Sequence, residues 1–421
     1  MSKPALSEIK EIVLPPSKSL YQRFLLLYGA QCLSTDKPLP HALIPGAHYP
    51  QDCRVMHRCV CALLAGAKEI DTSDNGTALR FLLTMAAMRP EPCVFHLANR
   101  RQRPVAETLK ALQDLGTHIT HSPDNEIIVR GPFTVNSVRI TATTTSQHFS
   151  ALMLIAPSLP NGLEIVINGE PVSQPYIDLT MATLRDLGVD ITRKGNTYRI
   201  PPARLPDMLS DIIEPDWASA VFAYEAVLTG RYGKCQLRSL SLDSRQPERK
   251  AADIFATLGV TSCQTSKGVI ISKDGKPHQA PVCIDARLCP DSIPALTVGM
   301  SAIGVPFTIT STSYLSSKES DRPEALRQGL ALMGKTLAVN NDNITYSPDN
   351  DNMAGITRPL TIRTHGDHRI AMAFAALPAA LCVNVDNTEC VSKSFPDFWQ
   401  QITARPAGHF AGKNSVDGFR P

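Results

Sequence analysis

The segment Leu109-Lys-Ala-Leu-Gln-Asp-Leu-Gly116 has the pattern of a helix end, with leucines at helical spacing followed by a glycine. Glycine readily adopts the left-handed conformation in which many helices terminate. The same pattern ends at Gly66, Gly188, Gly259 and Gly334. Successive glycines from Gly116 onward are separated by 72, 71 and 75 residues, and alternating, strand-like segments such as Tyr198-Arg-Ile follow. This periodicity predicts six copies of one α/β unit.

Prolines near the middle of the chain predict a domain boundary. The 421 residues are too many for one ordinary hydrophobic core, which favours two domains of three units each. Such a division falls near Pro201, Pro202, Pro206 and Pro215. Proline has no amide hydrogen to donate, so this segment is more typical of a connection than of a central strand.

Composition and charge argue against several classes of protein. The 42 Lys and Arg against 39 Asp and Glu give a net charge of +3, which is too balanced for a general nucleic-acid-binding surface. The sequence lacks an apolar run of about 18 residues, and Met1–Leu20 carries charges throughout. Eleven cysteines without a Cys-x-x-Cys pair indicate free thiols in a reducing compartment. We therefore expect a cytoplasmic protein that binds neither nucleic acid nor membranes.

The segment Lys318-Glu-Ser-Asp-Arg322 has five consecutive charged or hydroxyl side chains and no apolar face. Such a run suits a charged ligand, or a solvated helix start with Ser320 as the N-cap and Pro323 in the first turn. Further clusters likewise join a cation to small or hydroxyl residues, as an anion site requires. They are Pro16–Ser19 with Arg23, Asp74–Arg80, Arg100–Pro104, Asp367–Arg369 and Ser392–Asp397.

Two of these clusters have the form of an anion site at the start of a helix. Pro16–Ser19 follows the strand-like Ile12–Leu14 and precedes a helix-like segment. Unpaired N–H groups and the helix dipole favour an anion at such a turn, although the glycines of a P-loop are absent. Asp74–Thr77 repeats the arrangement, and Gly76 permits close approach of the backbone. Taken singly, each cluster could also be an ordinary helix cap with an exposed cation and no ligand.

Taken in order, these segments resemble the 5-enolpyruvylshikimate-3-phosphate (EPSP) synthases over most of the chain. Leu14–Ser19 with Arg23 is similar to the family pattern LPGSKS…R, with Pro16 in place of glycine, and Lys318–Arg322 matches KESDR. The other matching segments are Asp74–Arg80, Gln102–Pro104, Thr145–Gln147, Ser173–Ile177, Glu214–Ala220, Pro290–Asp291, Asp367–Met372 and Lys393–Phe398.

The resemblance implies an α/β fold: a two-domain inverse α/β barrel. Each domain would have three βαβαββ-type repeats around parallel helices, with the active site in the interdomain cleft. Family members cross between domains twice. This implies one domain of residues 1–17 plus 215–421, on the phosphoenolpyruvate side, and an inserted domain of residues 18–214, on the shikimate 3-phosphate side.

The resemblance also implies the reaction and its ligands. The enolpyruvyl group of phosphoenolpyruvate would pass to the 5-hydroxyl of shikimate 3-phosphate by addition and elimination, releasing phosphate. Shikimate 3-phosphate would contact Lys18, Ser19, Arg23, Thr145, Ser146, Gln147, Ser173, Tyr176, Asp291 and Lys318. Phosphoenolpyruvate would contact Lys18, Asp74, Gly76, Arg103, Gln147, Arg322, Arg369 and Lys393. Fixed cations are needed because two polyanions otherwise repel one another.

The catalytic groups implied by the resemblance are Asp291, Glu319 and Lys18. Asp291 is expected to take the proton of the 5-hydroxyl, while Glu319 and Lys18 exchange a proton with the methylene carbon of phosphoenolpyruvate; the division of roles stays open because coupled groups titrate together. The resemblance implies that no metal or organic cofactor is needed. The i,i+3 pair His365 and His368 is in itself a weak metal signal, since it has no further ligand beside it. We expect a monomer.

Three departures from the family pattern bear on function. Asp74 stands where the family has Asn, which places an anion beside the expected phosphoenolpyruvate site unless Asp74 caps its helix or points away. Gln102 replaces a Glu, and Ser316 replaces a common Arg. The alternatives are an enolpyruvyl transferase acting on UDP-N-acetylglucosamine, from which Ser19 after Lys18 departs, and a family member that binds ligand without turnover.

Overall fold

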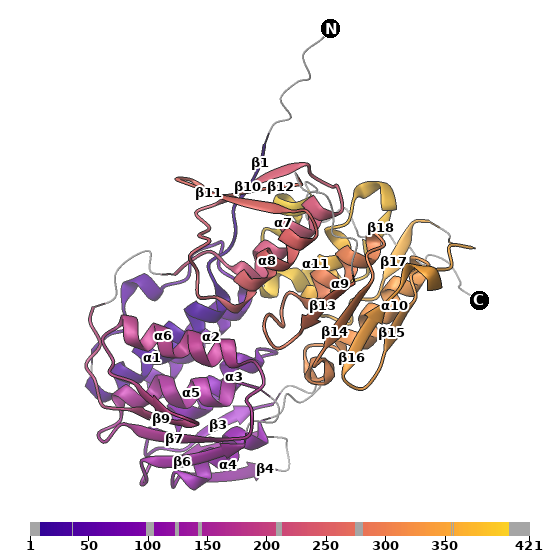
Figure 1. Cartoon of the computed structure of the whole chain (residues 1–421). Helices are drawn as coiled ribbons and strands as arrows, with labels where there is room; N and C mark the ends of the chain where they lie inside the picture. Colours follow the sequence, from indigo (N-terminus) through magenta and orange to yellow (C-terminus); the bar gives the residue numbers. More distant parts are fainter. Residues whose placement is uncertain are drawn as a thin grey trace, which may run out of the picture.

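The chain forms two lobes, each with its own hydrophobic core (Figure 1). The computed structural model describes residues 9–35, 37–97, 105–122, 126–141, 145–207, 213–273, 281–354, 356 and 358–403. One core contains buried residues from Leu20 to Leu205, and we name this part the insert lobe. The other joins Ile12 and Leu14 to residues from Trp217 to Ile402, and we name it the terminal lobe.

Four sheets share one topology, two in each lobe. Their strand orders are β2-β3-β5-β4 and β6-β7-β9-β8 in the insert lobe, and β1-β10-β12-β11 and β13-β14-β16-β15 in the terminal lobe. In every one the first two strands are parallel and the remaining pairings are antiparallel. A parallel pair joined through a helix, followed by a second helix and a hairpin, is the βαβαββ unit, as in β2-α3-β3-α4-β4-β5.

The strands are short. Those of the insert lobe are β2 (Glu69–Asp71), β3 (Cys93–His96), β4 (His118–Ser122), β5 (Glu126–Arg130), β6 (Ser137–Thr141), β7 (Leu163–Asn168), β8 (Thr192–Lys194) and β9 (Thr197–Ile200). Those of the terminal lobe are β1 (Lys10–Ile12), β10 (Lys234–Arg238), β11 (Thr261–Thr265), β12 (Gly268–Ser272), β13 (Val282–Asp285), β14 (Phe307–Thr310), β15 (Leu337–Val339), β16 (Asn343–Tyr346), β17 (Leu360–Ile362) and β18 (Val383–Val385).

The helices connect these strands. The insert lobe has α1 (Lys18–Thr35), α2 (Gln51–Leu64), α3 (Gly76–Ala86), α4 (Ala106–Asp114), α5 (Gln147–Ile155) and α6 (Gln174–Asp186), with short turns η1 (His41–Leu43) and η2 (Ala156–Ser158). The terminal lobe has α7 (Trp217–Leu228), α8 (Lys250–Thr257), α9 (Ile293–Ala302), α10 (Arg322–Leu332) and α11 (His368–Ala375). Its short turns are η3 (Pro247–Arg249), η4 (Ser313–Ser317), η5 (Pro348–Asn350), η6 (Ala379–Leu381), η7 (Glu389–Lys393) and η8 (Trp399–Thr403).

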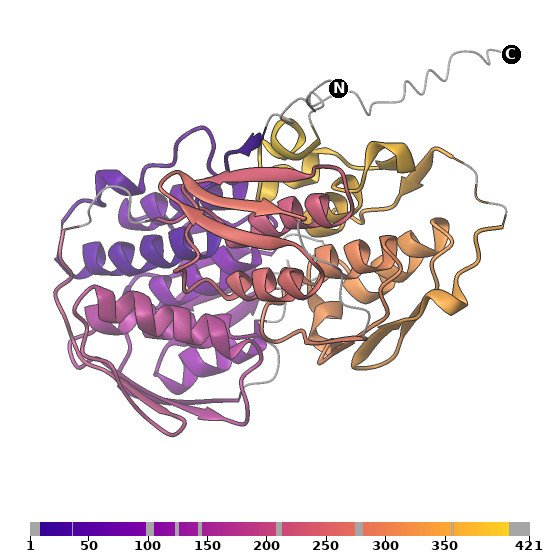
Figure 2. The same ribbon diagram turned by 45° about the horizontal axis from the view of Figure 1, so that its top comes forward.

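Central helices lie inside each lobe and the sheets lie outside them (Figures 1 and 2), while helices such as α2 and α4 keep an exposed face. The helices α5, α7 and α9 bury almost every residue, as expected for helices that are hydrophobic on all sides. Strands such as β6 and β7 instead bury alternate residues, so only one face of each sheet packs on helices. This arrangement, with mixed sheets around buried helices, confirms the predicted fold class.

The repeat is less regular than the predicted six copies. Beside the four complete units, α11 lies between two strands, β17 and β18, that form a parallel two-stranded sheet. The helices α1 and α2 pack together in the insert lobe, but α2 leads directly into β2 and carries no sheet of its own within the described residues. The sequence periodicity therefore located the repeat without showing which copies had lost strands.

The glycines that end the repeated helices adopt the predicted conformation. Gly66, Gly116, Gly188, Gly259 and Gly334 all have positive φ angles, between 76° and 93°. A side chain would strain this left-handed backbone, which is why glycine recurs there. The helix-end pattern was thus a reliable marker of each repeat.

Two antiparallel segments join the lobes. Pro16 and Pro215 form an isolated bridge, the N–H of Ser17 donates to the carbonyl of Glu214 at 2.8 Å, and the N–H of Asp216 donates to that of Pro15 at 2.9 Å. Helix α1 starts immediately after the first segment, and α7 after the second. The crossing therefore places the starts of two central helices side by side.

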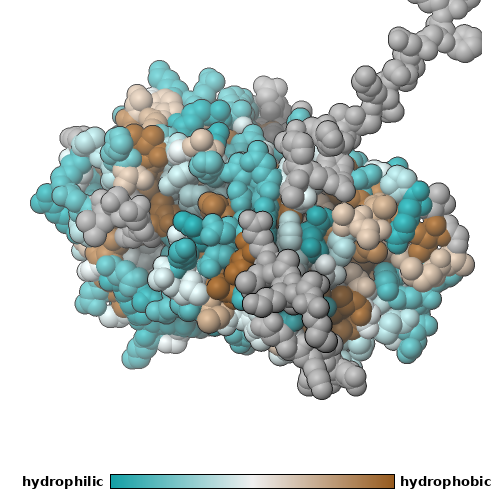
Figure 3. All heavy atoms as spheres, turned by 90° about the horizontal axis from the view of Figure 1, so that it is seen from above, coloured by the Kyte–Doolittle hydropathy of each residue, from teal (hydrophilic) through white to brown (hydrophobic). Residues whose placement is uncertain are grey.

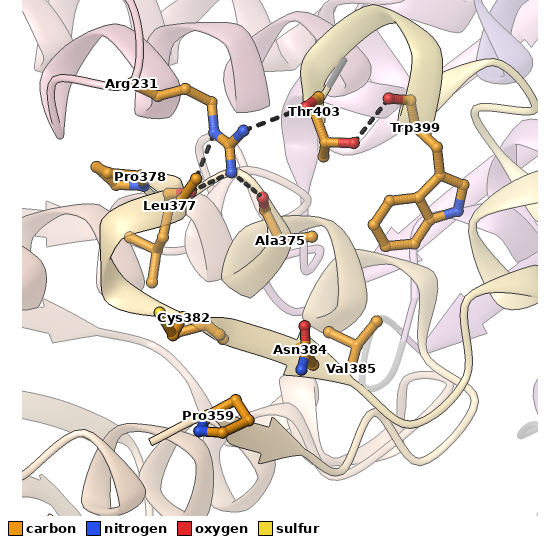
Figure 4. Close-up of a pocket in the computed structure, with 12 residues that line it drawn as sticks. Arg231, Pro359, Ala375, Leu377, Pro378, Cys382, Asn384, Val385, Trp399 and Thr403 are labelled. Carbon is orange, nitrogen blue, oxygen red and sulfur yellow. Dashed lines mark hydrogen bonds between the residues drawn. The ribbon is translucent and has the colours of Figure 1, made fainter. Parts of the chain in front are cut away.

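Arg231 ties the end of α11 to the C-terminal turns (Figure 4). Its guanidinium donates to the carbonyls of Ala375 and Ala376, each at 3.0 Å, and to that of Leu377. A cation at these carbonyls stabilises the negative end of the helix dipole. The adjacent cavity of about 210 Å³ is also lined by Trp399 and Thr403, so this arginine has a structural role in the terminal lobe.

The molecular surface is mixed. On the face shown in Figure 3, hydrophobic residues form separate patches among hydrophilic ones. Among the described residues, no helix is both long and apolar enough to cross a membrane.

We predict that Gly329→Ala destabilises the terminal lobe. Alanine favours helix formation by about 1 kcal/mol over glycine, but a β-carbon at this position of α10 would overlap the buried ring of Phe374, with Cε2 at 2.8 Å. Overpacking costs about 1 to 3 kcal/mol, so the net effect should be a loss of stability. Urea denaturation measures the free energy of unfolding.

Gly233→Ala is the control, because its new methyl group would meet no atom within 4 Å. It should leave the free energy of unfolding within about 0.5 kcal/mol of the wild-type value. Equal effects of the two substitutions would contradict the packing argument.

Candidate active site

Arg322 lies at the start of α10 and is surrounded by three carboxylates. Its Nε donates to Asp367 at 2.9 Å, one terminal nitrogen to Glu319 at 2.9 Å and the other to Asp291 at 3.2 Å. The side chain is only 1% exposed. Burial acts to lower the pKa of Arg322, but the carboxylates outweigh it and raise the pKa. The guanidinium is therefore permanently charged and held in one orientation.

Asp291 lies between two guanidiniums. One carboxylate oxygen accepts from Arg322 and the other from Arg369 at 2.7 Å. Burial acts to raise the pKa of Asp291, but Arg369 and Arg322 reverse this and hold the pKa well below its usual range. A carboxylate so strongly stabilised as an anion is a weak base. The predicted role of Asp291 in proton transfer therefore requires anionic ligands that compete with it for Arg322 and Arg369.

Asp367 organises the turn that carries Arg369. It caps α11 by accepting from the backbone N–H of Arg369 at 2.9 Å, and it also accepts from the hydroxyl of Ser320 at 3.1 Å. The guanidinium of Arg369 reaches back to the carbonyl of Ala218 on α7, at 3.1 Å. One buried aspartate therefore fixes both arginines, Arg322 directly and Arg369 through its helix cap.

Lys18, in the first turn of α1, is the cation that the insert lobe brings to this centre. Its Nζ donates to Asp52 of α2 at 2.9 Å. Burial acts to lower the pKa of Lys18, but the Asp52 and Glu319 carboxylates together outweigh it, and the pKa is raised. Arg369 and Glu319 of the terminal lobe lie close enough to act on it electrostatically. The structure thus brings all three predicted catalytic residues, Lys18, Glu319 and Asp291, into one cluster.

Lys393 and Asp74 pair across the two lobes. The lysine Nζ, on η7, contacts the carbonyl of Asp74 at 3.0 Å and its carboxylate at 3.3 Å. Asp74 does not cap α3, because the neighbouring Asn75 accepts the N–H of Ala78. A helix-capping role, which would have kept the Asp74 carboxylate away from the expected phosphoenolpyruvate site, is therefore excluded. The carboxylate instead pairs with Lys393, a cation expected to bind phosphoenolpyruvate.

Gln147 is held at the first turn of α5. Its amide oxygen accepts from Arg80 at 2.7 Å, and its amide nitrogen donates to the hydroxyl of Thr77 at 3.0 Å. Arg80 also donates to the carbonyl of Gly76 at 3.1 Å. The segments 74–80 and 145–147, far apart in sequence, consequently form one polar surface.

The hydroxyl-rich residues of the insert lobe gather around Arg23. Its guanidinium donates to Thr180 at 2.9 Å, to the carbonyl of Ser19 at 2.8 Å and to that of Tyr176 at 3.2 Å, and it lies over the Tyr176 ring. Burial lowers the pKa of Arg23 to about 10, so it remains charged at neutral pH. Ser173 immediately precedes α6 with φ of 63°, a left-handed conformation that serine adopts at a cost.

A cavity of about 550 Å³ opens on this centre. It is lined by Asp74 from the insert lobe and by Lys318, Glu319 and His365 among the residues of the terminal lobe. Lys318 lies above the ring of Tyr314, with Nζ 5.5 Å from the ring centre. The N-cap of α10 is Asp321, which accepts from the N–H of Glu324, and not Ser320 as predicted, because the Ser320 hydroxyl donates to Asp367 instead.

Three buried residues beside the cluster received no role from the sequence. Arg80 lies in the motif Asp74–Arg80, which could have suggested a role for it. His368 is fully buried and its ring nitrogens have no hydrogen-bond partner among the described residues; burial, with Lys18 and Arg369 nearby, holds its pKa well below the usual value. Glu248 is 2% exposed and receives the hydroxyl hydrogen of Tyr176. No motif pointed to Glu248.

Most of the predicted site residues therefore line one region between the lobes. Thr145 and Ser146 adjoin Gln147 there, with the Thr145 hydroxyl accepting the N–H of Gln147 at 3.3 Å. Arg103 lies outside the described residues. No group of three or more His, Cys, Asp and Glu side chains suited to a metal ion occurs in the described part of the chain.

Comparison with known proteins identifies relatives along nearly the whole chain. The family model for EPSP synthase (3-phosphoshikimate 1-carboxyvinyltransferase) matches residues 48–402. A 3-phosphoshikimate 1-carboxyvinyltransferase of Bacteroides fragilis is 32% identical, over 96% of this chain and 97% of the relative. One of Methanosphaerula palustris is 30% identical, over 80% of this chain and 79% of the relative.

Solved structures share the fold. EPSP synthase from Acinetobacter baumannii superposes with a TM-score of 0.66 and 18% identity, covering 94% of this chain and 95% of the other. The enolpyruvyl transferase NikO from Streptomyces tendae gives 0.65 at 14% identity, with coverage of 94% and 95%. The family model covers most of the chain and the Bacteroides fragilis relative matches almost all of it, so the chain belongs to the EPSP synthase family.

Proposed function

We propose that this protein transfers the enolpyruvyl group of phosphoenolpyruvate to the 5-hydroxyl of shikimate 3-phosphate, giving 5-enolpyruvylshikimate 3-phosphate and phosphate. This reaction serves the biosynthesis of chorismate and the aromatic amino acids. The observation that carries the proposal is the meeting of Lys18 from one lobe with Arg369 and Lys393 from the other at a single centre. Fixed cations of this kind offset the repulsion between two polyanionic substrates.

The proposed domains are residues 18–214 and residues 1–17 plus 215–421. The separate hydrophobic cores support this division, since Leu14 belongs to one core and Leu20 to the other. The paired crossings at Pro16 and Pro215 support it as well. The monomeric state and the cytoplasmic location stay predictions.

Each substrate is proposed to contact a different set of residues. Shikimate 3-phosphate would contact mainly the hydroxyl-rich surface around Arg23, with Asp291 and Lys318 on the opposite lobe. Phosphoenolpyruvate would lie among Lys18, Arg322, Arg369 and Lys393. The remaining proposed contacts of shikimate 3-phosphate are Lys18, Ser19, Thr145, Ser146, Gln147, Ser173 and Tyr176. Those of phosphoenolpyruvate are Asp74, Gly76, Arg103 and Gln147, so Lys18 and Gln147 are shared by the two substrates.

In the proposed chemistry, the 5-oxygen attacks C2 of phosphoenolpyruvate while Asp291 takes its proton. A proton is added to the methylene carbon, giving a tetrahedral intermediate; loss of a methyl proton and departure of phosphate then restore the double bond. Glu319 and Lys18 are the proposed partners of that carbon. The phosphoenolpyruvate carboxylate and phosphate would compete with Asp291 for Arg322 and Arg369. This competition would raise the pKa of Asp291 when the substrate binds and so make it a stronger base.

A phosphate-release assay tests this function. We expect release only when phosphoenolpyruvate and shikimate 3-phosphate are both present. Release with UDP-N-acetylglucosamine as the acceptor would assign the chain to the other transferase activity. Binding of shikimate 3-phosphate in calorimetry without release at high protein concentration would instead indicate a ligand-binding member without turnover.

Replacing Lys393 with alanine should weaken phosphoenolpyruvate binding selectively. The loss of one charge-assisted contact is worth about 1.5 to 3 kcal/mol, so the KM for phosphoenolpyruvate should rise by roughly 10- to 150-fold. The KM for shikimate 3-phosphate should change by less than about threefold. Steady-state kinetics with each substrate varied in turn measures both values. An equal rise in the two would contradict the proposed position of Lys393.

Replacing Asp74 with asparagine should improve phosphoenolpyruvate binding. The variant removes the anion that pairs with Lys393 but retains the backbone carbonyl contact. Asp74 is 62% exposed, so the pair is weak and the expected fall in the KM is only about two- to fivefold. Asp114→Asn, the same charge change on an exposed carboxylate of α4, is the control. An unchanged or higher KM in Asp74→Asn would show that the pair does not compete with substrate.

A further inference from the structure

Glu248 connects the two lobes at the centre of the site. It lies on η3 in the terminal lobe and is 2% exposed. The hydroxyl of Tyr176, on α6 of the insert lobe, lies 2.9 Å from each of its carboxylate oxygens. The backbone N–H of Asp291 donates to one of those oxygens at 3.4 Å. A single side chain therefore contacts one residue of the sugar-phosphate surface and the residue proposed as the base.

Each of its two partners is already fixed within its own lobe. Tyr176 is held through its carbonyl and its ring by Arg23. The Asp291 carboxylate is held by Arg322 and Arg369. Glu248 thus links two rigid sets of groups, and its position determines how one set lies relative to the other.

Glu248 occupies a position that is costly for a carboxylate. Burial and the charge of Asp291 raise the pKa of Glu248 to about 7. Its contacts are a tyrosine hydroxyl and a backbone N–H, so both partners require an acceptor oxygen at this position and neither requires a negative charge. The lobes are also joined elsewhere at lower cost, for example by the exposed pair Arg245 and Asp186 at 2.6 Å.

We propose that Glu248 is a positioning residue for enolpyruvyl transfer, which holds the Tyr176 hydroxyl against the Asp291 backbone and so aligns the base with the acceptor sugar when the lobes meet. This inference rests on the proposed function. It concerns the shikimate 3-phosphate side, because both partners are proposed contacts of that substrate. Phosphoenolpyruvate binding should depend on Glu248 only weakly.

The test compares three variants by steady-state kinetics and thermal unfolding. Glu248→Ala removes the acceptor, and we expect kcat to fall by about 10- to 100-fold and the KM for shikimate 3-phosphate to rise, with the KM for phosphoenolpyruvate within about twofold. Glu248→Gln keeps an acceptor of the same shape and should recover most of the activity. Asp186→Asn breaks the exposed interlobe pair and should leave all kinetic constants unchanged.

A double variant shows whether Glu248 acts through Tyr176. The combined loss in Tyr176→Phe/Glu248→Ala should be smaller than the product of the two single losses. Wild-type kinetics in Glu248→Ala, equal rises in both KM values, a glutamine variant no better than alanine, or multiplicative losses would each overturn the inference. If Glu248→Ala does not fold, the glutamine variant alone decides: because it retains the acceptor, near-wild-type constants support positioning, and a tenfold loss overturns it.

Failure of the proposed function is distinguishable from failure of this inference. A wild-type protein that releases no phosphate from the two substrates would overturn the function alone. Calorimetry with shikimate 3-phosphate would then test Glu248 directly. Weaker binding in Glu248→Ala, restored in Glu248→Gln, would support the positioning role, and equal affinities would overturn it.

Discussion

The buried pairing of Arg322 with Asp367, Glu319 and Asp291 is the interaction on which the site depends. An unpaired charge at this depth would be strongly destabilising, so each member requires the others. Asp367 accepts from Arg322 and also caps α11, and Arg369 shares Asp291 with Arg322. The terminal lobe thereby holds two guanidiniums in fixed positions before any ligand binds. Such preorganised charges need little rearrangement as negative charge arrives.

The two lobes have separate cores, so their polar groups meet only across the surface between them. The chain passes between the lobes at the paired segments around Pro16 and Pro215, so the start of α1 and the start of α7 are fixed beside one another. Farther away, Lys393 pairs with Asp74 and Tyr176 with Glu248. A site assembled from both lobes is complete only where the lobes meet, which suits a reaction that requires exclusion of water.

The repeat shows which parts of the structure local sequence can specify. The helix-end glycines, from Gly66 to Gly334, could be recognised because a left-handed residue is a local backbone requirement. The absence of a sheet beside α1 and α2 could not be recognised from the sequence, because the helix ends are spaced in the same way whether or not strands accompany them. For the site, Lys318 to Arg322 was recognisable as a run without an apolar face, yet which carboxylates surround Arg322 depends on residues 31 and 45 positions away.

By itself the sequence determined the α/β class, the approximate repeat, the family and most of the charged residues of the cleft, since these follow from periodicity and from short motifs whose members are near neighbours in the chain. Only the tertiary structure decided which charges meet. It showed that the Asp74 carboxylate pairs with Lys393 and that Asp291 is held by two arginines. It also showed that Glu248, outside every motif, lies between the lobes. The reason is physical: burial and ion pairing depend on distances between elements, and no local pattern encodes them.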